Sequence, residues 1–122
     1  MTQARILIVD DNAVIRATLK SLIKQDKQFT VIGEAASAQA ALTAMDETAP
    51  DVVCLDVLMP GMDGLSLLKH IREKHEGSRV VMITGEARAE VVKEALALGA
   101  RGFVVKPFSA AKVLHAIRQA LA

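Results

Sequence analysis

Five short apolar runs recur along the chain, and they constrain its fold more than any other feature. Four of them are followed directly by a polar residue. The runs predict strands over residues 5–9, 29–35, 52–55, 80–83 and 102–105. Most are continuously apolar, which is typical of strands buried on both faces of a parallel sheet. The run 29–35 alternates more clearly, as expected of a less buried edge strand.

Helical patterns fill the segments between these runs. Apolar residues at helical spacing predict helices over residues 13–24, 38–47, from 65 to about 75–77, 87–98, and after Ser109. Asn12, Ser37 and Ser109 are expected helix N-caps, and Gly99 is an expected C-terminal cap. Strands that alternate with helices predict an α/β fold in one domain over residues 1–122. Its sheet would be parallel, with right-handed crossovers.

Charge, aromatic content and cysteine content exclude several classes of protein. Hydrophobic residues make up 52% of the 122 residues, which favours a packed core over disorder. Aromatic residues at 2% and a net charge of +1 argue against nucleic-acid binding by stacking or by bulk electrostatics. The lone Cys54 fits a reducing compartment. Without a signal-like segment or a bilayer-length apolar stretch, the sequence predicts a soluble cytoplasmic protein.

Reactive side chains stand where the predicted strands end. They are Asp10, Asp11, Asp56, Thr84 and Lys106. Because the carboxyl ends of parallel strands lie on one edge of a sheet, we expect these side chains to converge. Three close carboxylates repel one another, and a hard divalent cation such as Mg²⁺ relieves that repulsion. A hydroxyl and an ammonium suit phosphate oxygens, so the residue types predict Mg²⁺-assisted phosphoryl transfer to an aspartate.

The same residues resemble the motifs of a known family. Asp10-Asp11, the segment Asp-Val-Leu-Met-Pro-Gly-Met-Asp-Gly that begins at Asp56, Thr84-Gly85 and Lys106-Pro107-Phe108 are similar to the receiver domain of bacterial response regulators. The resemblance covers essentially the whole chain. It implies a flavodoxin-like, doubly wound sheet of five parallel strands in the order 2-1-3-4-5, with five helices.

The resemblance also implies a metal site and a phosphorylation site. Asp56 would be the phosphoacceptor. Asp11, Asp56 and the backbone carbonyl of Leu58 would bind Mg²⁺ directly, while Asp10 would act largely through water. Lys106 would pair with the phosphate.

Four further features rest on resemblance alone. Thr84 would move to hydrogen-bond the phosphate, and Phe103 would be the switch aromatic. The Lys106-Pro107 peptide would be cis. Leu58 and Glu86 would flank the path of the water that hydrolyses the phosphoaspartate.

The implied function is a phosphorylation-activated switch of a two-component system or of a phosphorelay. The phosphoryl donor would be a phosphohistidine on a sensor histidine kinase or a histidine phosphotransfer protein. Phosphorylation would change the affinity for a downstream protein. The domain would catalyse only its own phosphoryl transfer and dephosphorylation, with no direct contact to nucleic acid or a membrane.

Two other functions compete with this interpretation. A phosphohydrolase with an aspartate nucleophile usually has a second acid two residues later, where this chain has Leu58, and a cap domain that this chain lacks. A flavin- or nucleotide-binding module is disfavoured because the chain has neither a G-x-G-x-x-G motif nor a P-loop. Turnover of a small phosphate ester, against stoichiometric self-labelling, separates the phosphohydrolase from the switch.

Several residues have plainer interpretations. A helix N-cap explains Asp63, and Cys54 is expected to be a small core residue. A basic ridge on the first helix is interpreted as a solvated face; its members are Arg16, Lys20 and Lys24. The three histidines are expected to lie on the surface without convergent partners, so a zinc site is not predicted; they are His70, His75 and His115.

Overall fold

Strands and helices alternate along the whole described part of the chain. The computed structural model describes residues 3–57, 63–85 and 88–122. The strands are β1 (Ala4–Val9), β2 (Phe29–Ala35), β3 (Val52–Leu55), β4 (Arg79–Thr84) and β5 (Gly102–Val105). The helices are α1 (Ala13–Ile23), α2 (Ala38–Thr48), α3 (Gly64–Lys74), α4 (Ala89–Ala97) and α5 (Ala110–Leu121). The predicted alternation is confirmed, and the ends of the elements differ from expectation by at most three residues.

All five strands pair in parallel in one sheet, in the order β2-β1-β3-β4-β5. The predicted doubly wound sheet is therefore confirmed. From β1 the chain goes outward to the edge strand β2 and then returns to β3 on the other side of β1. In sheets of this kind, ligands bind where the strand order reverses, outside the carboxyl ends of the strands. Here that place is the carboxyl end of β1 and β3.

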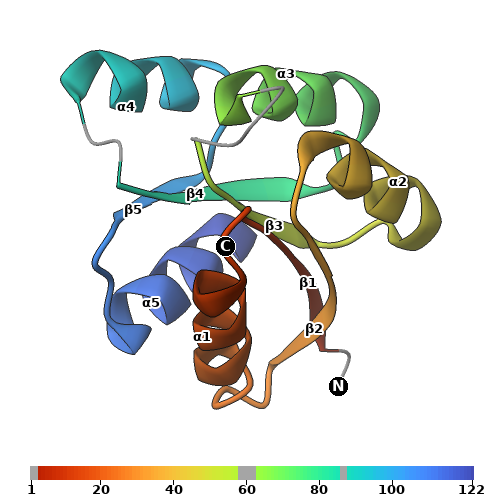
Figure 1. Ribbon diagram of the computed structural model, residues 1–122, viewed down its shortest axis with the longest axis vertical. Helices are drawn as coiled ribbons and strands as arrows, with labels where there is room; N and C mark the ends of the chain where they lie inside the picture. The colour runs from red at the N-terminus through yellow and green to blue at the C-terminus, as the bar shows by residue number, and fades with distance from the viewer. Residues whose placement is uncertain (1–2, 58–62, 86–87) are drawn as a thin grey trace.

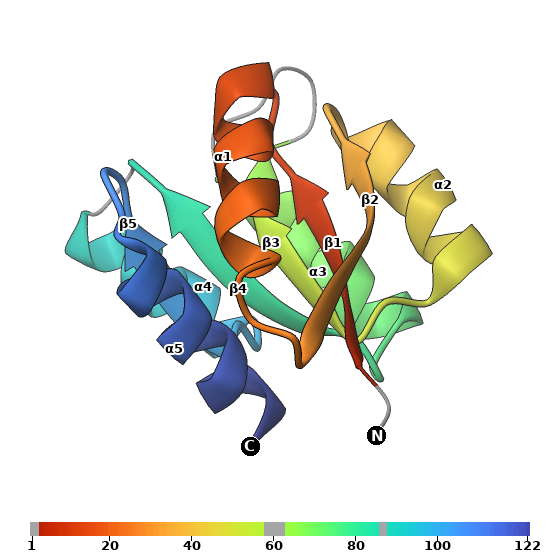
Figure 2. The same ribbon diagram turned by 90° about the horizontal axis from the view of Figure 1, so that it is seen from below.

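Helices cover both faces of the sheet (Figure 1). α2, α3 and α4 lie on one face, and α1 and α5 lie on the other; Figure 2 shows the latter pair in front of the strands. Each face buries its own aliphatic cluster, and neighbouring residues of a strand contribute to opposite clusters. This double burial explains why β3, the interior of β4 and residues 6–9 of β1 are apolar, whereas the less buried edge strand β2 includes Thr30 and Glu34. Among the described helices, none has the length and hydropathy needed to cross a bilayer.

The edge strand β2 contains a bulge that changes the direction of one acidic side chain. Ile6 pairs with Val31, but Leu7 pairs with Gly33, so Ile32 is an extra residue in β2. After the bulge, Glu34 pairs with Ile8, which belongs to the cluster on the α1 side. Because side chains alternate between faces, Glu34 would point to the α2 side if the extra residue were absent.

The predicted N-caps are confirmed. The side chains of Asn12, Ser37, Asp63 and Ser109 each accept a hydrogen bond from a backbone N–H in the first turn of the following helix. Gly99, with φ of 103°, follows the last turn of α4 in the left-handed conformation that glycine favours. Asp63 thus has the structural role that the sequence predicted.

One histidine differs from expectation. The His75 side chain is only 18% exposed, and its Nε2 lies 3.1 Å from a carboxylate oxygen of Asp46 in α2. The prediction of a surface histidine without a partner is therefore wrong for His75. It follows α3 directly as the C-cap, so α2 and α3 are near enough for this contact.

Gly64, the first residue of α3, packs directly against the backbone that follows β3. A Cβ atom at this position would overlap the Asp56 carbonyl oxygen and the Val57 Cα. We predict that Gly64→Ala lowers the free energy of unfolding by about 2 kcal/mol, because backbone must move to make room. Urea unfolding measures this. In the control Gly77→Ala the added Cβ meets nothing within 4 Å, and a loss equal to that of Gly64→Ala would contradict the steric argument.

Candidate functional site

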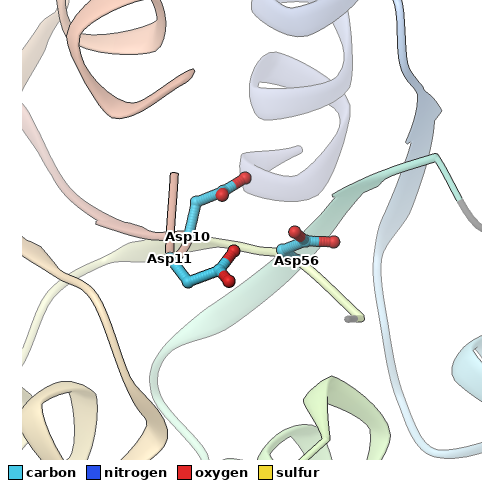
Figure 3. A group of neighbouring side chains, drawn as sticks. All are labelled: Asp10, Asp11 and Asp56. Atoms are coloured by element: carbon cyan, nitrogen blue, oxygen red, sulfur yellow. The ribbon is translucent and has the colours of Figure 1, made fainter. Parts of the chain in front are cut away.

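The ends of β1 and β3 bring the acidic residues together. Val9 pairs with Leu55, so Asp10 and Asp56 are the next residues on adjacent strands. The Asp56 N–H donates to the Val9 carbonyl at 3.1 Å, which extends the ladder into the site. Figure 3 shows Asp10, Asp11 and Asp56 close together at this edge of the sheet. One carboxylate oxygen from each residue lies within 4.8 Å of the other two.

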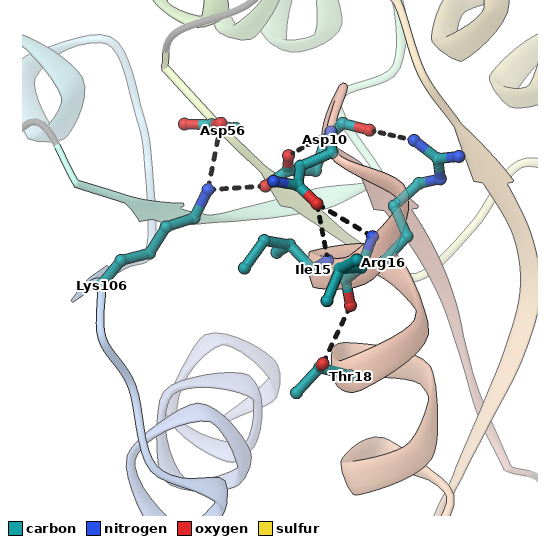
Figure 4. Close-up of polar contacts among 8 residues, drawn as sticks. Asp10, Ile15, Arg16, Thr18, Asp56 and Lys106 are labelled. Carbon is teal, nitrogen blue, oxygen red and sulfur yellow. Dashed lines mark hydrogen bonds and ion pairs between the residues drawn. The ribbon is translucent and has the colours of Figure 1, made fainter.

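Lys106 places an ammonium group between two of these carboxylates (Figure 4). Its Nζ lies 2.8 Å from Asp10 Oδ2 and 3.2 Å from Asp56 Oδ2. The Lys106 backbone N–H donates to the Thr84 carbonyl at 2.9 Å, which holds this residue beside the end of β4. The side chains of Asp10 and Asp56 are only 2% and 7% exposed. Buried anions need a compensating cation, and Lys106 supplies it.

The pKa of Lys106 reflects this double contact. Burial lowers the pKa, but the hydrogen bond to Asp10 and the charges of Asp10 and Asp56 outweigh burial and raise the pKa above its ordinary value of 10.5. The folded protein therefore holds this proton more tightly than the unfolded chain does. The resulting stabilisation is fully present below pH 10.5 and is lost as the pH rises through the raised pKa.

The carboxylates of Asp10 and Asp11 differ in their surroundings. Asp10 Oδ1 accepts the Asn12 N–H at 2.9 Å, and Asp10 Oδ2 accepts from Lys106, so both oxygens are engaged. Asp11 is exposed, and no donor from residues 3–57, 63–85 or 88–122 bonds its carboxylate. Asp11 is thus better placed than Asp10 to bind a cation directly.

The donor set fits a hard divalent cation. Its ligand atoms are carboxylate oxygens, which Mg²⁺ and Ca²⁺ prefer, and the exposed Asp11 leaves room for retained waters. Cys54 does not belong to the site, because it packs in the cluster on the α1 and α5 face. Burial raises the pKa of the Cys54 thiol to about 12, so it remains protonated and is not a thiolate ligand.

The structure describes some, but not all, of the remaining predicted site residues. Thr84 ends β4 and is fully buried. Strand register puts Phe103 on the same face of the sheet as Thr84, where Phe103 packs half-buried against the cluster of that face. The Lys106-Pro107 peptide is cis, as the family resemblance implied. Leu58 and Glu86 lie outside the described residues.

One residue near the site differs from the sequence-based prediction. The sequence predicts Arg16 on a solvated basic ridge, but its side chain is only 18% exposed. Its Nη1 donates to the Asp10 backbone carbonyl at 2.7 Å, and its Nε lies 3.1 Å from Glu34 Oε1. The available signal was its place in the first turns of the helix that starts at the site. The orientation of its partner Glu34 depends on the β2 bulge, which the sequence pattern does not reveal.

This fold and this acidic site define an α/β receiver of the response-regulator type, and comparison with known proteins agrees. Residues 6–118 match the family described as the response regulator receiver domain. The chain belongs to this family. It is a phosphorylation-activated switch of two-component signalling, and receiver domains interact with histidine kinases and downstream targets.

The relatives include proteins of two lengths. The chain is 40% identical to the chemotaxis protein CheY of Listeria monocytogenes, covering 95% of this chain and 97% of that protein. It is 37% identical to the transcriptional regulatory protein YdfI of Bacillus subtilis, covering 96% of this chain but 54% of that protein. It thus spans about half the length of the latter relative. Among solved structures, a chain of the CheX-CheY-BeF3-Mg complex from Borrelia burgdorferi has a TM-score of 0.93 at 32% identity, covering 99% of this chain and 91% of that chain.

Removal of the Lys106 ammonium should destabilise the metal-free protein. We predict that Lys106→Met lowers the free energy of unfolding by about 2 kcal/mol, less than for a fully buried ion pair because Lys106 is partly exposed. A divalent cation should recover part of this loss, since it replaces the missing positive charge. Urea unfolding with and without Mg²⁺ measures both effects. Lys112→Met, which removes an exposed ammonium, is the control; a Lys106→Met protein as stable as this control would contradict the charge argument.

Proposed function

We propose that Asp56 accepts a phosphoryl group from a phosphohistidine on a sensor histidine kinase or a histidine phosphotransfer protein. The observation that carries this proposal is the convergence of three carboxylates and the Lys106 ammonium at the carboxyl edge of the sheet. An Asp56 carboxylate oxygen attacks phosphorus and forms a P–O bond. The P–N bond breaks, and its electron pair returns to the imidazole nitrogen. The product is an acyl phosphate on Asp56.

Different groups around Asp56 would stabilise the phosphoryl oxygens and hold the metal ion. The Lys106 ammonium already contacts an oxygen of Asp56, so it is placed to pair with a phosphoryl oxygen attached there. Asp11, Asp56 and the backbone carbonyl of Leu58 would hold Mg²⁺ directly, and Asp10 would act through water. Bound Mg²⁺ supplies positive charge that stabilises the phosphoryl oxygens during transfer.

The conformational response would start at Thr84. Its hydroxyl would move toward the phosphoryl group on Asp56 and donate a hydrogen bond. Thr84 and Phe103 share one face of the sheet, so this movement would make room for the Phe103 ring to turn inward. Because a phenyl ring has no hydroxyl, packing alone would hold the inward position. The shifted population would have a different affinity for a downstream protein.

We further propose that residues 1–122 act as one receiver unit whose chemistry is confined to Asp56. It takes on one phosphoryl group, hydrolyses it, and turns over no separate substrate. The phosphohydrolase alternative receives no support at the position two residues after Asp56, since Leu58 has no proton to donate.

Labelling with acetyl phosphate, a small phosphodonor, tests the assignment of Asp56. We predict one phosphoryl group per chain by intact mass spectrometry, only when Mg²⁺ is present. Asp56→Asn should remove the label, as should a chelator. Asp63→Asn is a matched control, because asparagine also caps helices well. Labelling of Asp56→Asn equal to that of the wild type would show that Asp56 is not the phosphoacceptor. Repeated turnover of p-nitrophenyl phosphate would favour a phosphohydrolase instead.

A further inference from the structure

The Asp10–Asp11 segment is held by an arginine from outside the acidic cluster. The Arg16 guanidinium donates from Nη1 to the backbone carbonyl of Asp10 at 2.7 Å, a contact drawn in Figure 4. This carbonyl belongs to the peptide bond that joins Asp10 to Asp11. Since no described donor holds the Asp11 carboxylate itself, the direction of this side chain depends on how firmly that peptide is fixed.

Glu34 orients the guanidinium. Its Oε1 accepts from Arg16 Nε at 3.1 Å, while Lys20 contributes a longer contact of 3.7 Å to Glu34 Oε2. Glu34 reaches the α1 side of the sheet because of the extra residue Ile32 in β2. Bulges commonly change the direction of a side chain next to an active site. The bulge, the Glu34 carboxylate and the Arg16 guanidinium therefore form one continuous connection from the sheet edge to the acidic cluster.

Arg16 has two opposite effects on a cation in this cluster. Its positive charge repels the cation, which weakens binding. Its hydrogen bond to Asp10 fixes the Asp11 peptide before the cation arrives, which strengthens binding. Glu34 reduces the first effect, because its negative charge compensates the guanidinium in an ion pair. No comparable interaction among the described residues offsets the fixing of the Asp11 peptide, so the strengthening effect on cation binding should prevail.

We propose that Arg16, oriented by Glu34, is a positioning residue that fixes the Asp10–Asp11 peptide and thereby raises the affinity of the acidic cluster for a divalent cation. This inference rests on the proposed metal site of Asp10, Asp11 and Asp56. It assigns Arg16 no contact with the cation or with the phosphoryl group. The planar guanidinium is essential, because a lysine ammonium does not bridge a carbonyl and a carboxylate with the same fixed geometry.

Binding of Mn²⁺, followed by the electron paramagnetic resonance signal of the free ion, tests this role. Arg16→Met and Arg16→Lys should both weaken binding about tenfold, as is typical when a group that orients a metal ligand is removed. Lys20→Met is the matched control. It removes a positive charge that lies on the same helix and contacts Glu34, but it leaves the bond between Arg16 and Asp10 in place. Its affinity should stay within about twofold of wild type, as expected for an exposed pair.

The outcomes separate positioning from charge and from general stability. Unchanged or tighter Mn²⁺ binding by folded Arg16→Met would overturn the proposal, and so would full rescue by Arg16→Lys. Thermal melts are measured on the same variants without metal. If Arg16 had only a structural role, its substitution would lower the melting midpoint and leave the Mn²⁺ affinity of the folded protein unchanged. If Arg16→Met does not fold, Glu34→Ala removes the orienting carboxylate and should also weaken binding. No Mn²⁺ binding by the wild type would instead reject the metal site itself.

Discussion

A single ammonium group shared by two buried carboxylates is the interaction on which this site depends. Asp10 and Asp56 follow paired residues of neighbouring strands, so the fold forces their charges together. Lys106 contacts both of them from the segment after β5. One ammonium does not balance three carboxylates, and the exposed Asp11 carries the charge that Lys106 does not contact. This excess of negative charge in a partly buried place is the physical basis for binding a hard cation.

The doubly wound sheet makes this arrangement possible. With helices on both faces, the central strands are apolar in their interiors, and the polar residues that follow them gather at one edge. β1 and β3 are central neighbours at the reversal of strand order, so Asp10 and Asp56 are carried on well-packed strands. The same sheet joins the site to Phe103, since Thr84 on β4 and Phe103 on β5 share a face. The proposed switch would use this shared face to carry a change at Asp56 toward Phe103.

The fold and most of the site were predictable because their causes are local or follow from parallel pairing. Apolar runs and capping residues such as Ser37 and Asp63 define the elements, and parallel strands bring Asp56 and Lys106 to one edge. Arg16 was not predictable, because its orientation depends on a bulge in β2 that only strand register reveals. The cis peptide before Pro107 followed from family resemblance, because no residue pattern alone specifies it.

The crystal structure of the protein with Mn²⁺ and beryllofluoride tests most directly whether the acidic cluster, Asp56 and Lys106 form one phosphoryl-transfer site. Anomalous scattering locates the Mn²⁺ ion independently of the protein. The account predicts Mn²⁺ bonded to carboxylate oxygens of Asp11 and Asp56, beryllofluoride on Asp56, and the Lys106 ammonium bonded to a fluorine. Mn²⁺ bound away from Asp11 and Asp56, or beryllofluoride on another carboxylate, would contradict it.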